Sequence, residues 1–333
     1  MTSSTAAIAR PRRSVPAAIT LFFVAPFVAE YLLGDVSLKL LSALIVMAPM
    51  YGGGALLIRE HVRHKGRGWP TILCLGAAYA LLEEGLVTQS LFNPDYLNLH
   101  LQFLQPAHVA WLGIGGWWTL LMLNLHAFWS IGVSIALVEA LWPERTREPW
   151  LGKVGHDVVD VIFLLGLVAN TIFGYRQNQF WGSRAQLGVA AIVCVLLVVI
   201  ALATPAGMGK REGTVPSPWL TGIAALVLGS LLRLVPMQWG WGAVAAMLAV
   251  DAVFLLMVYA LSRRKTWTLL HTLSLGAGGA VAYGLHAFLG RPFGGGLVLA
   301  RIGNVIFLLI ALVLIAIGAR RTAAVLDARS RVA

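Results

Sequence analysis

Two adjacent acidic residues lie inside an otherwise apolar stretch of the chain. Glu83 and Glu84 fall within residues 70–91, a run long enough to cross a lipid bilayer. A carboxylate at the centre of a membrane helix costs about 2.5–3.5 kcal/mol on insertion scales, and neighbouring carboxylates repel each other. We therefore expect one of them to carry a proton or to be paired with a partner. Such a pair is suited to general acid–base chemistry.

A histidine lies on the next apolar stretch, residues 114–142. His126, Ser130 and Ser134 are four residues apart and would form one polar stripe on a helix. If 70–91 and 114–142 cross the membrane as antiparallel neighbours, a rise of about 1.5 Å per residue places Glu84 about 21 Å and His126 about 24 Å from the same face. The sequence thus predicts a catalytic site of Glu83, Glu84 and His126. The predicted supporting polar residues are Thr88, Gln89, Asn124 and Ser130.

Other kinds of catalytic site fit the residues less well. Ser130 is a poor nucleophile for His126, because one turn of the same helix does not give attack geometry and no oxyanion-binding group is evident. Glu84 and His126 offer two ligands for a metal, but the chain has no HExxH sequence and no second histidine at helical spacing. Nucleotide, haem and flavin signatures are missing too, so we predict neither a metal nor a cofactor.

The segment 82–89 resembles the paired-glutamate motif EExxxR of the CAAX-protease and bacteriocin-processing family of intramembrane glutamate proteases. Residues 126–130 resemble the HxxxN motif of that family, with Ser130 in the position of the Asn. The resemblance implies that Glu83 and Glu84 activate a water for peptide hydrolysis and that His126 binds the oxyanion or the water. Two positions depart from the family pattern: Thr88 replaces the Arg, and Met122 replaces the Phe of the FxxxH motif.

Composition places the chain in the membrane. Of its 333 residues, 59% are hydrophobic and 12% are charged, whereas soluble domains have about 25% charged residues. The net charge of +11 is explained by membrane topology, and we expect no nucleic-acid partner. The expected partners are the lipid bilayer and an unidentified small-molecule, lipid or peptide substrate.

Ten stretches are long and apolar enough to span. They are 15–34, 37–58, 70–91, 114–142, 154–174, 186–204, 218–236, 239–261, 267–289 and 296–318. With the N-terminus inside, 19 of the 25 Lys and Arg residues fall on the inner side and 6 on the outer side, as the positive-inside rule requires. We therefore predict an all-α polytopic bundle of about ten transmembrane helices in the cytoplasmic (plasma) membrane, with both termini cytoplasmic.

The whole chain, 1–333, is expected to form a single transmembrane domain. Residues 1–14 and 319–333 are predicted cytoplasmic tails, and 92–113 is a predicted outer loop. Within this loop, residues 96–103 alternate between apolar and polar types, which is typical of a strand in water. Beside a membrane we favour an interfacial or re-entrant piece lying over the site.

Three further polar or glycine-rich features stand out in the sequence. The first two have two interpretations each, and the third has one. Asp251, near the middle of the eighth stretch, is either a structural partner of another polar group or a proton or ion site. The run 52–54 is three glycines, which form a packing notch or leave room for a substrate. Arg59 and Glu60 end the second stretch and are expected as charges at the inner interface.

Three functions remain open on the sequence. The Glu–His site could belong to a water-activating, peptidase-like hydrolase. The same protonatable groups would serve a proton-coupled secondary transporter or permease, since they can relay protons. Alternatively, the polar cluster only fixes the packing of a non-catalytic membrane protein.

Overall fold

The computed structural model describes residues 14–206, 209–290 and 292–331, and these residues are mostly helical. The α-helices are α1 (Val15–Pro26), α2 (Ala43–His64), α3 (Trp69–Leu81), α4 (Gly116–Asn124), α5 (Ser134–Leu141), α6 (Lys153–Asn178), α7 (Arg184–Ala203), α8 (Pro218–Leu234), α9 (Trp241–Ser262), α10 (Leu269–His286) and α11 (Leu297–Ser330). Three π-helical segments continue α-helices: η1 (Phe27–Leu32), η3 (Leu82–Val87) and η5 (Leu125–Val133). Short 3-10 turns are η2 (Leu38–Leu40), η4 (Tyr96–Asn98), η6 (Pro143–Arg145) and η7 (Met237–Trp239), and β1 (His108–Val109) pairs antiparallel with β2 (Ile114–Gly115).

Each of the ten predicted stretches is helical over most of its length. Among the described residues, eight helices are long and apolar enough to cross a membrane. α8 is shorter, with 17 residues, and α10 is not among the eight. An all-α chain with several apolar helices of membrane-spanning length is therefore confirmed.

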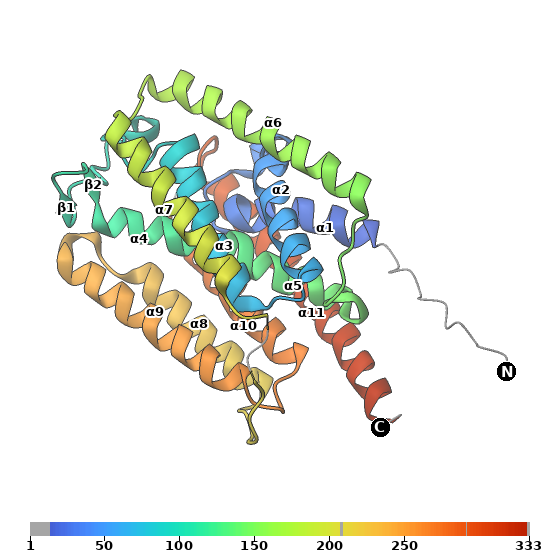
Figure 1. Cartoon of the computed structure of the whole chain (residues 1–333). Coiled ribbons are helices and arrows are strands. Elements are labelled where there is room, and N and C mark those ends of the chain that lie inside the picture. Colours follow the sequence, from blue (N-terminus) through green and yellow to red (C-terminus); the bar gives the residue numbers. More distant parts are fainter. Residues whose placement is uncertain (1–13, 207–208, 291, 332–333) are drawn as a thin grey trace.

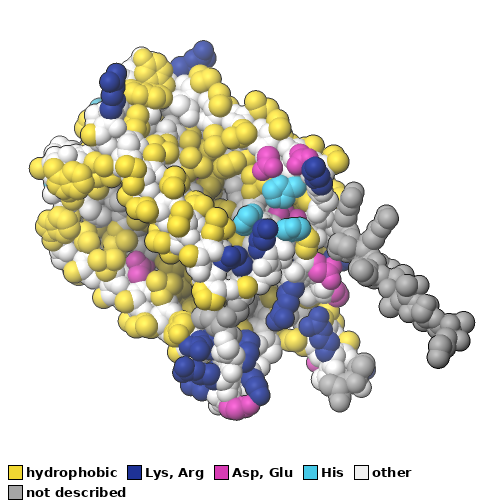
Figure 2. Space-filling model, viewed as in Figure 1, with side chains coloured by type: hydrophobic (Ala, Val, Ile, Leu, Met, Phe, Trp, Pro, Cys, Tyr) yellow, Lys and Arg dark blue, Asp and Glu magenta, His cyan; other side chains and the backbone are white. Residues whose placement is uncertain are grey.

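The helix formed by α4, η5 and α5 lies at the centre of the bundle. In its most apolar window 89% of the residues are buried, compared with 11% for α7 and 6% for α9. α7 packs against α3, and α8 packs against α10 and α9 (Figure 1). The peripheral helices expose large apolar side chains such as Ile192 and Leu256, and such side chains cover much of the flank in Figure 2. Outward-facing apolar surface of this extent is characteristic of contact with lipid.

The three glycines of α2 form a packing notch. A Cβ atom at Gly52 would lie 1.9 Å from the carbonyl oxygen of Phe22, so α1 and α2 approach each other through their backbones. A Cβ atom at Gly54 would lie 2.4 Å from the ring of Tyr79 on α3. Because glycine has no side chain, neighbouring helices can approach closely at these positions. The notch thereby brings Tyr79 next to α2.

Arg59 and Glu60, which were predicted as charges at the inner interface, are buried inside the protein. Arg59 is 0% exposed and Glu60 is 1% exposed. Arg59 binds Glu60 at 2.6 Å and Glu139 of α5 at 3.2 Å, and its guanidinium lies 3.6 Å from the centre of the Trp150 ring. The backbone N–H groups of Trp150 and Leu151 donate to Glu60. The segment that follows α5 thus folds back over the end of α2 and buries its charges.

In the predicted outer loop, residues 96–103 form a 3-10 turn and irregular backbone rather than the strand that their alternation is typical of, and the two-residue strands β1 and β2 come later in the chain. The C-terminal segment differs from expectation. The expected C-terminal tail is largely the continuation of α11, which ends at Ser330. Thr322 is 0% exposed there, and its hydroxyl donates to the carbonyl oxygen of Ala140 at 3.3 Å. Packing against α5 therefore keeps this basic segment helical.

Candidate active site

Glu83, Glu84 and His126 meet between the third and fourth apolar stretches of the chain. The Nε2 atom of His126 lies 2.8 Å from Oε1 of Glu84, and its Nδ1 atom lies 3.3 Å from Oε2 of Glu83. The three residues are 1%, 7% and 4% exposed in chain order. Both nitrogens of one imidazole thus face carboxylates in apolar surroundings, where electrostatic interactions are stronger than in water.

Each helix that supplies a charged group to this region does so from a π-helical segment. η3 carries Glu83 and Glu84, η5 carries His126, and η1 carries a third carboxylate, Glu30. A π-helical turn contains an extra residue relative to an α-helix and is frequent at functional sites. The extra residue changes the direction in which the following side chains point.

Hydroxyl groups bind carbonyl oxygens of the widened turns. Thr88 donates to the carbonyl of Glu83 at 3.1 Å, and Ser130 donates to the carbonyl of Leu125 at 3.3 Å. Ser134 donates to the carbonyl of Trp129 at 3.4 Å. In all three pairs the hydroxyl lies five residues after the carbonyl, which matches the spacing of a π-helical turn. The polar stripe of the fourth stretch therefore satisfies backbone groups that lipid cannot satisfy.

The second oxygen of Glu84 is held by the segment after η3. Thr88 donates to Glu84 Oε2 at 3.0 Å, and the hydroxyl of Ser90 donates to the same atom. Ser130 also lies 3.4 Å from Nδ1 of His126. Thr88 and Ser130 thus lie at the site, as predicted, whereas Ser90 was missed. Ser90 follows the end of the helix, so helical spacing did not indicate it.

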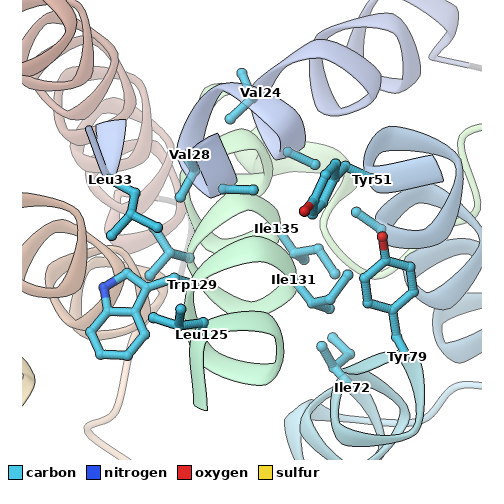
Figure 3. Close-up of a cluster of buried hydrophobic side chains, with 14 of the residues drawn as sticks. Val24, Val28, Leu33, Tyr51, Ile72, Tyr79, Leu125, Trp129, Ile131 and Ile135 are labelled. Carbon is cyan, nitrogen blue, oxygen red and sulfur yellow. The ribbon is translucent and has the colours of Figure 1, made fainter. Parts of the chain in front are cut away.

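Glu30 and Tyr51 belong to the same buried region and were also missed. The hydroxyl of Tyr51 donates to Glu30 Oε1 at 2.5 Å. The Tyr51 ring stacks on His126 with 6.0 Å between ring centres, and Tyr79 meets His126 edge-on at 5.9 Å. Figure 3 shows Tyr51 and Tyr79 on the same side of the helix that carries Ile131. A lone carboxylate in the first apolar stretch was the available signal for Glu30.

Three other predicted polar residues lie elsewhere. Gln89 accepts from the backbone N–H of Gly182 at 2.7 Å and so ties the segment after η3 to the start of α7. Asn124 donates to Asp251 Oδ2 at 3.1 Å, which is the structural pair considered for Asp251. The Asn124–Asp251 contact connects α4 to α9. Among the described residues, Gln89, Asn124 and Asp251 make no side-chain hydrogen bond to Glu83, Glu84 or His126.

Two buried polar atoms at the site are without a hydrogen bond to any described residue: Glu83 Oε2 and the hydroxyl of Tyr79. Such atoms are rare in folded proteins and call for an explanation. Glu83, Glu84 and His126 also each offer one ligand atom, and these atoms lie within 4.8 Å of one another. They could hold a metal ion, since catalytic zinc sites commonly have three protein ligands. The sequence predicted these three residues as a site but not as metal ligands, because the chain has no HExxH sequence.

Comparisons with known proteins place the chain in a family without adding a reaction. No curated protein matches the chain, and no solved structure matches it. The sequence profile of one family, described as an uncharacterized membrane protein family, matches residues 19–333. This match covers nearly the whole chain and agrees with the apolar helices of the structure. The chain therefore belongs to that membrane protein family.

Proposed function

We propose that Glu83, Glu84 and His126 form an acid–base site that activates a water for hydrolysis of a peptide or lipid substrate. The observation that supports this proposal is the position of the His126 ring between two carboxylates. The paired-glutamate resemblance of residues 82–89 points in the same direction. A positioned carboxylate or imidazole contributes about 10²–10⁴-fold to such a reaction.

The contacts assign different roles to the two carboxylates. Glu84 accepts from His126, Thr88 and Ser90, so it serves as a fixed anion that orients the imidazole. Glu83 retains an oxygen without a hydrogen bond among the described residues, and this oxygen takes the proton from the attacking water. His126 then holds the water or the developing oxyanion through Nδ1, because its Nε2 atom is bound to Glu84.

The membrane topology belongs to the same proposal. With about ten transmembrane helices and both termini in the cytoplasm, η3 ends near the outer face of the plasma membrane. Glu84 is three residues from that end, beneath the segment that carries Thr88 and Ser90. Substrate would then approach from the outer side, past this segment.

The test uses the full chain in lipid nanodiscs, incubated with a membrane peptide and lipid extract in water enriched in ¹⁸O. Hydrolysis by the wild type adds one ¹⁸O atom to a product, detected by mass spectrometry. Glu83→Gln and Glu84→Gln should each reduce the labelled product by about 10²-fold or more. Glu144→Gln, an exposed carboxylate outside the site, is the matched control and should behave as the wild type. Retained activity in folded Gln variants would reject the proposal.

Proton-coupled transport is the second candidate, favoured by the contact between Tyr51 and Glu30. This contact extends the line of protonatable groups from η3 and η5 to η1. In proteoliposomes that contain a pH-sensitive dye, transport would appear as substrate-dependent proton movement that Glu30→Gln abolishes. A purely structural cluster would instead give variants with lowered thermal stability and neither labelled product nor proton movement.

A further inference from the structure

A cavity of about 1130 Å³ lies on the other side of η5 from the Glu–His site. Ala127 and Trp129 of η5 line it, whereas His126 points to η3. Figure 3 shows Trp129 on the opposite side of this helix from Tyr51 and Tyr79. The volume of the cavity slightly exceeds the range of about 300–1,000 Å³ that is usual for ligand pockets.

The body of the cavity is apolar. α3 contributes Leu73 to its wall, α8 contributes Leu228, and α9 contributes Phe254 and Val258. Asn124 and Asp251, which bind each other at 3.1 Å, also line it. Asp251 lies eleven residues before Ser262, the last residue of α9, which corresponds to about 16 Å along the helix axis. This depth is about half of the 30 Å hydrocarbon core, the thickness of one lipid leaflet.

One end of the cavity is strongly basic. Its lining includes five cationic residues: Arg63, Arg67, Arg147, Lys210 and Arg329. The acid at this end, Glu139, is already bound by Arg59 and Arg63. Arg147 and Arg329 are exposed and make no ion pair with any described residue. Figure 2 shows Lys and Arg side chains gathered at the end of the molecule where α9 and α11 finish. This end therefore has positive charge available for an anion.

We propose that the cavity binds an anionic phospholipid. The phosphate of its headgroup lies among Arg147, Lys210 and Arg329, and its acyl chains follow the apolar wall toward Asn124. Charge complementarity selects the headgroup, because basic residues near the membrane surface attract anionic lipids. The apolar wall is about as deep as one lipid leaflet, so it fits the acyl chains of a lipid, which a soluble phosphate compound does not have. This inference is independent of the hydrolysis proposed for Glu83, Glu84 and His126.

The test is native mass spectrometry of the delipidated full chain titrated with phosphatidylglycerol or phosphatidylcholine. The wild type should bind phosphatidylglycerol at least about tenfold more tightly than phosphatidylcholine. The triple change Arg147→Gln, Lys210→Gln and Arg329→Gln should weaken phosphatidylglycerol binding at least about tenfold. The control removes the same charge from exposed positions that do not line the cavity: Lys65→Gln, Lys153→Gln and Arg331→Gln. This control should bind the lipid as the wild type does.

Two further measurements test the apolar part of the site. Ala77→Trp places a large ring in the cavity and should abolish the preference for phosphatidylglycerol. Leu255→Trp, at a cavity position that is 44% exposed, makes the same test if the first variant does not fold. Glycerol 3-phosphate, which has the phosphate without acyl chains, should not compete with the lipid. Equal loss in both triple variants, equal binding of the two lipids, or competition by glycerol 3-phosphate would overturn the proposal.

Discussion

The Nε2 atom of His126 lies 2.8 Å from Oε1 of Glu84, although the two residues are 42 positions apart in the chain. The contact joins η5, in the most buried helix, to η3, at the end of α3. Both side chains are removed from water and from lipid, so each depends on the other for its polar partner. This mutual dependence leads to the first prediction.

Glu84→Gln and His126→Gln are expected to be energetically coupled. In a double-mutant cycle the interaction term should be about 0.5–3 kcal/mol, because either change alone leaves a buried polar group with a poorer partner. Unfolding in mixed micelles of detergent and sodium dodecyl sulfate measures the term. The control cycle combines Glu84→Gln with Thr322→Val, which packs on Ala140, about 21 Å along the helix from His126. Equal coupling in the two cycles would contradict a direct contact.

Ser130→Ala is expected to keep the proposed hydrolytic activity. Ser130 donates to a backbone carbonyl of η5, so its loss should lower the free energy of unfolding by about 1 kcal/mol. Incorporation of ¹⁸O into the product and unfolding in mixed micelles are measured on the same preparation. A folded Ser130→Ala protein without activity would show that this hydroxyl takes part in the chemistry.

Arg59→Met is expected to destabilise the protein by about 3–5 kcal/mol, because it leaves the buried carboxylates of Glu60 and Glu139 with fewer partners. Arg320→Met, on the exposed side of α11, should change the free energy of unfolding by less than about 0.5 kcal/mol. Thermal unfolding in detergent compares the two variants. Similar melting temperatures would mean that the Arg59 network contributes nothing to stability.

Gly52→Ala and Gly188→Ala are expected to act in opposite directions. The added methyl group at position 52 would clash with the backbone of Phe22 and should cost about 1–3 kcal/mol or more. At position 188 no heavy atom from another part of the fold lies within 4 Å of the new Cβ, so the better helix propensity of Ala should stabilise α7 by up to about 1 kcal/mol. Chemical unfolding of the two variants measures both changes, and a Gly52→Ala protein as stable as the wild type would refute the notch.

The sequence predicted the helices well because length and hydropathy are local properties. Each predicted stretch corresponds to a helix, including 186–204, which is α7 (Arg184–Ala203). The meeting of Glu84 and His126 was predictable for a similar reason, since depth along an antiparallel pair follows from the rise per residue. Glu30 could have been found too, because a carboxylate in an apolar run is a signal wherever it occurs.

Features that depend on distant parts of the chain could not be predicted in this way. The burial of Arg59 and Glu60 requires the segment around Trp150 to fold back onto α2, which spacing does not reveal. Asn124 was placed with the site by its depth alone. It is two residues before His126, and residues at that spacing face different sides of a helix. Its partner is accordingly Asp251 on α9.

The extra residue in η5 divides one membrane crossing into two rotational phases. One added residue rotates everything after it by about 100° relative to an uninterrupted α-helix. Asn124, before this segment, reaches α9, whereas Glu139, after it, reaches the arginines of α2. A regular α-helix of the same sequence would turn one half of the crossing away from its neighbours. The rotation between the two halves thus determines which neighbouring helices each half contacts.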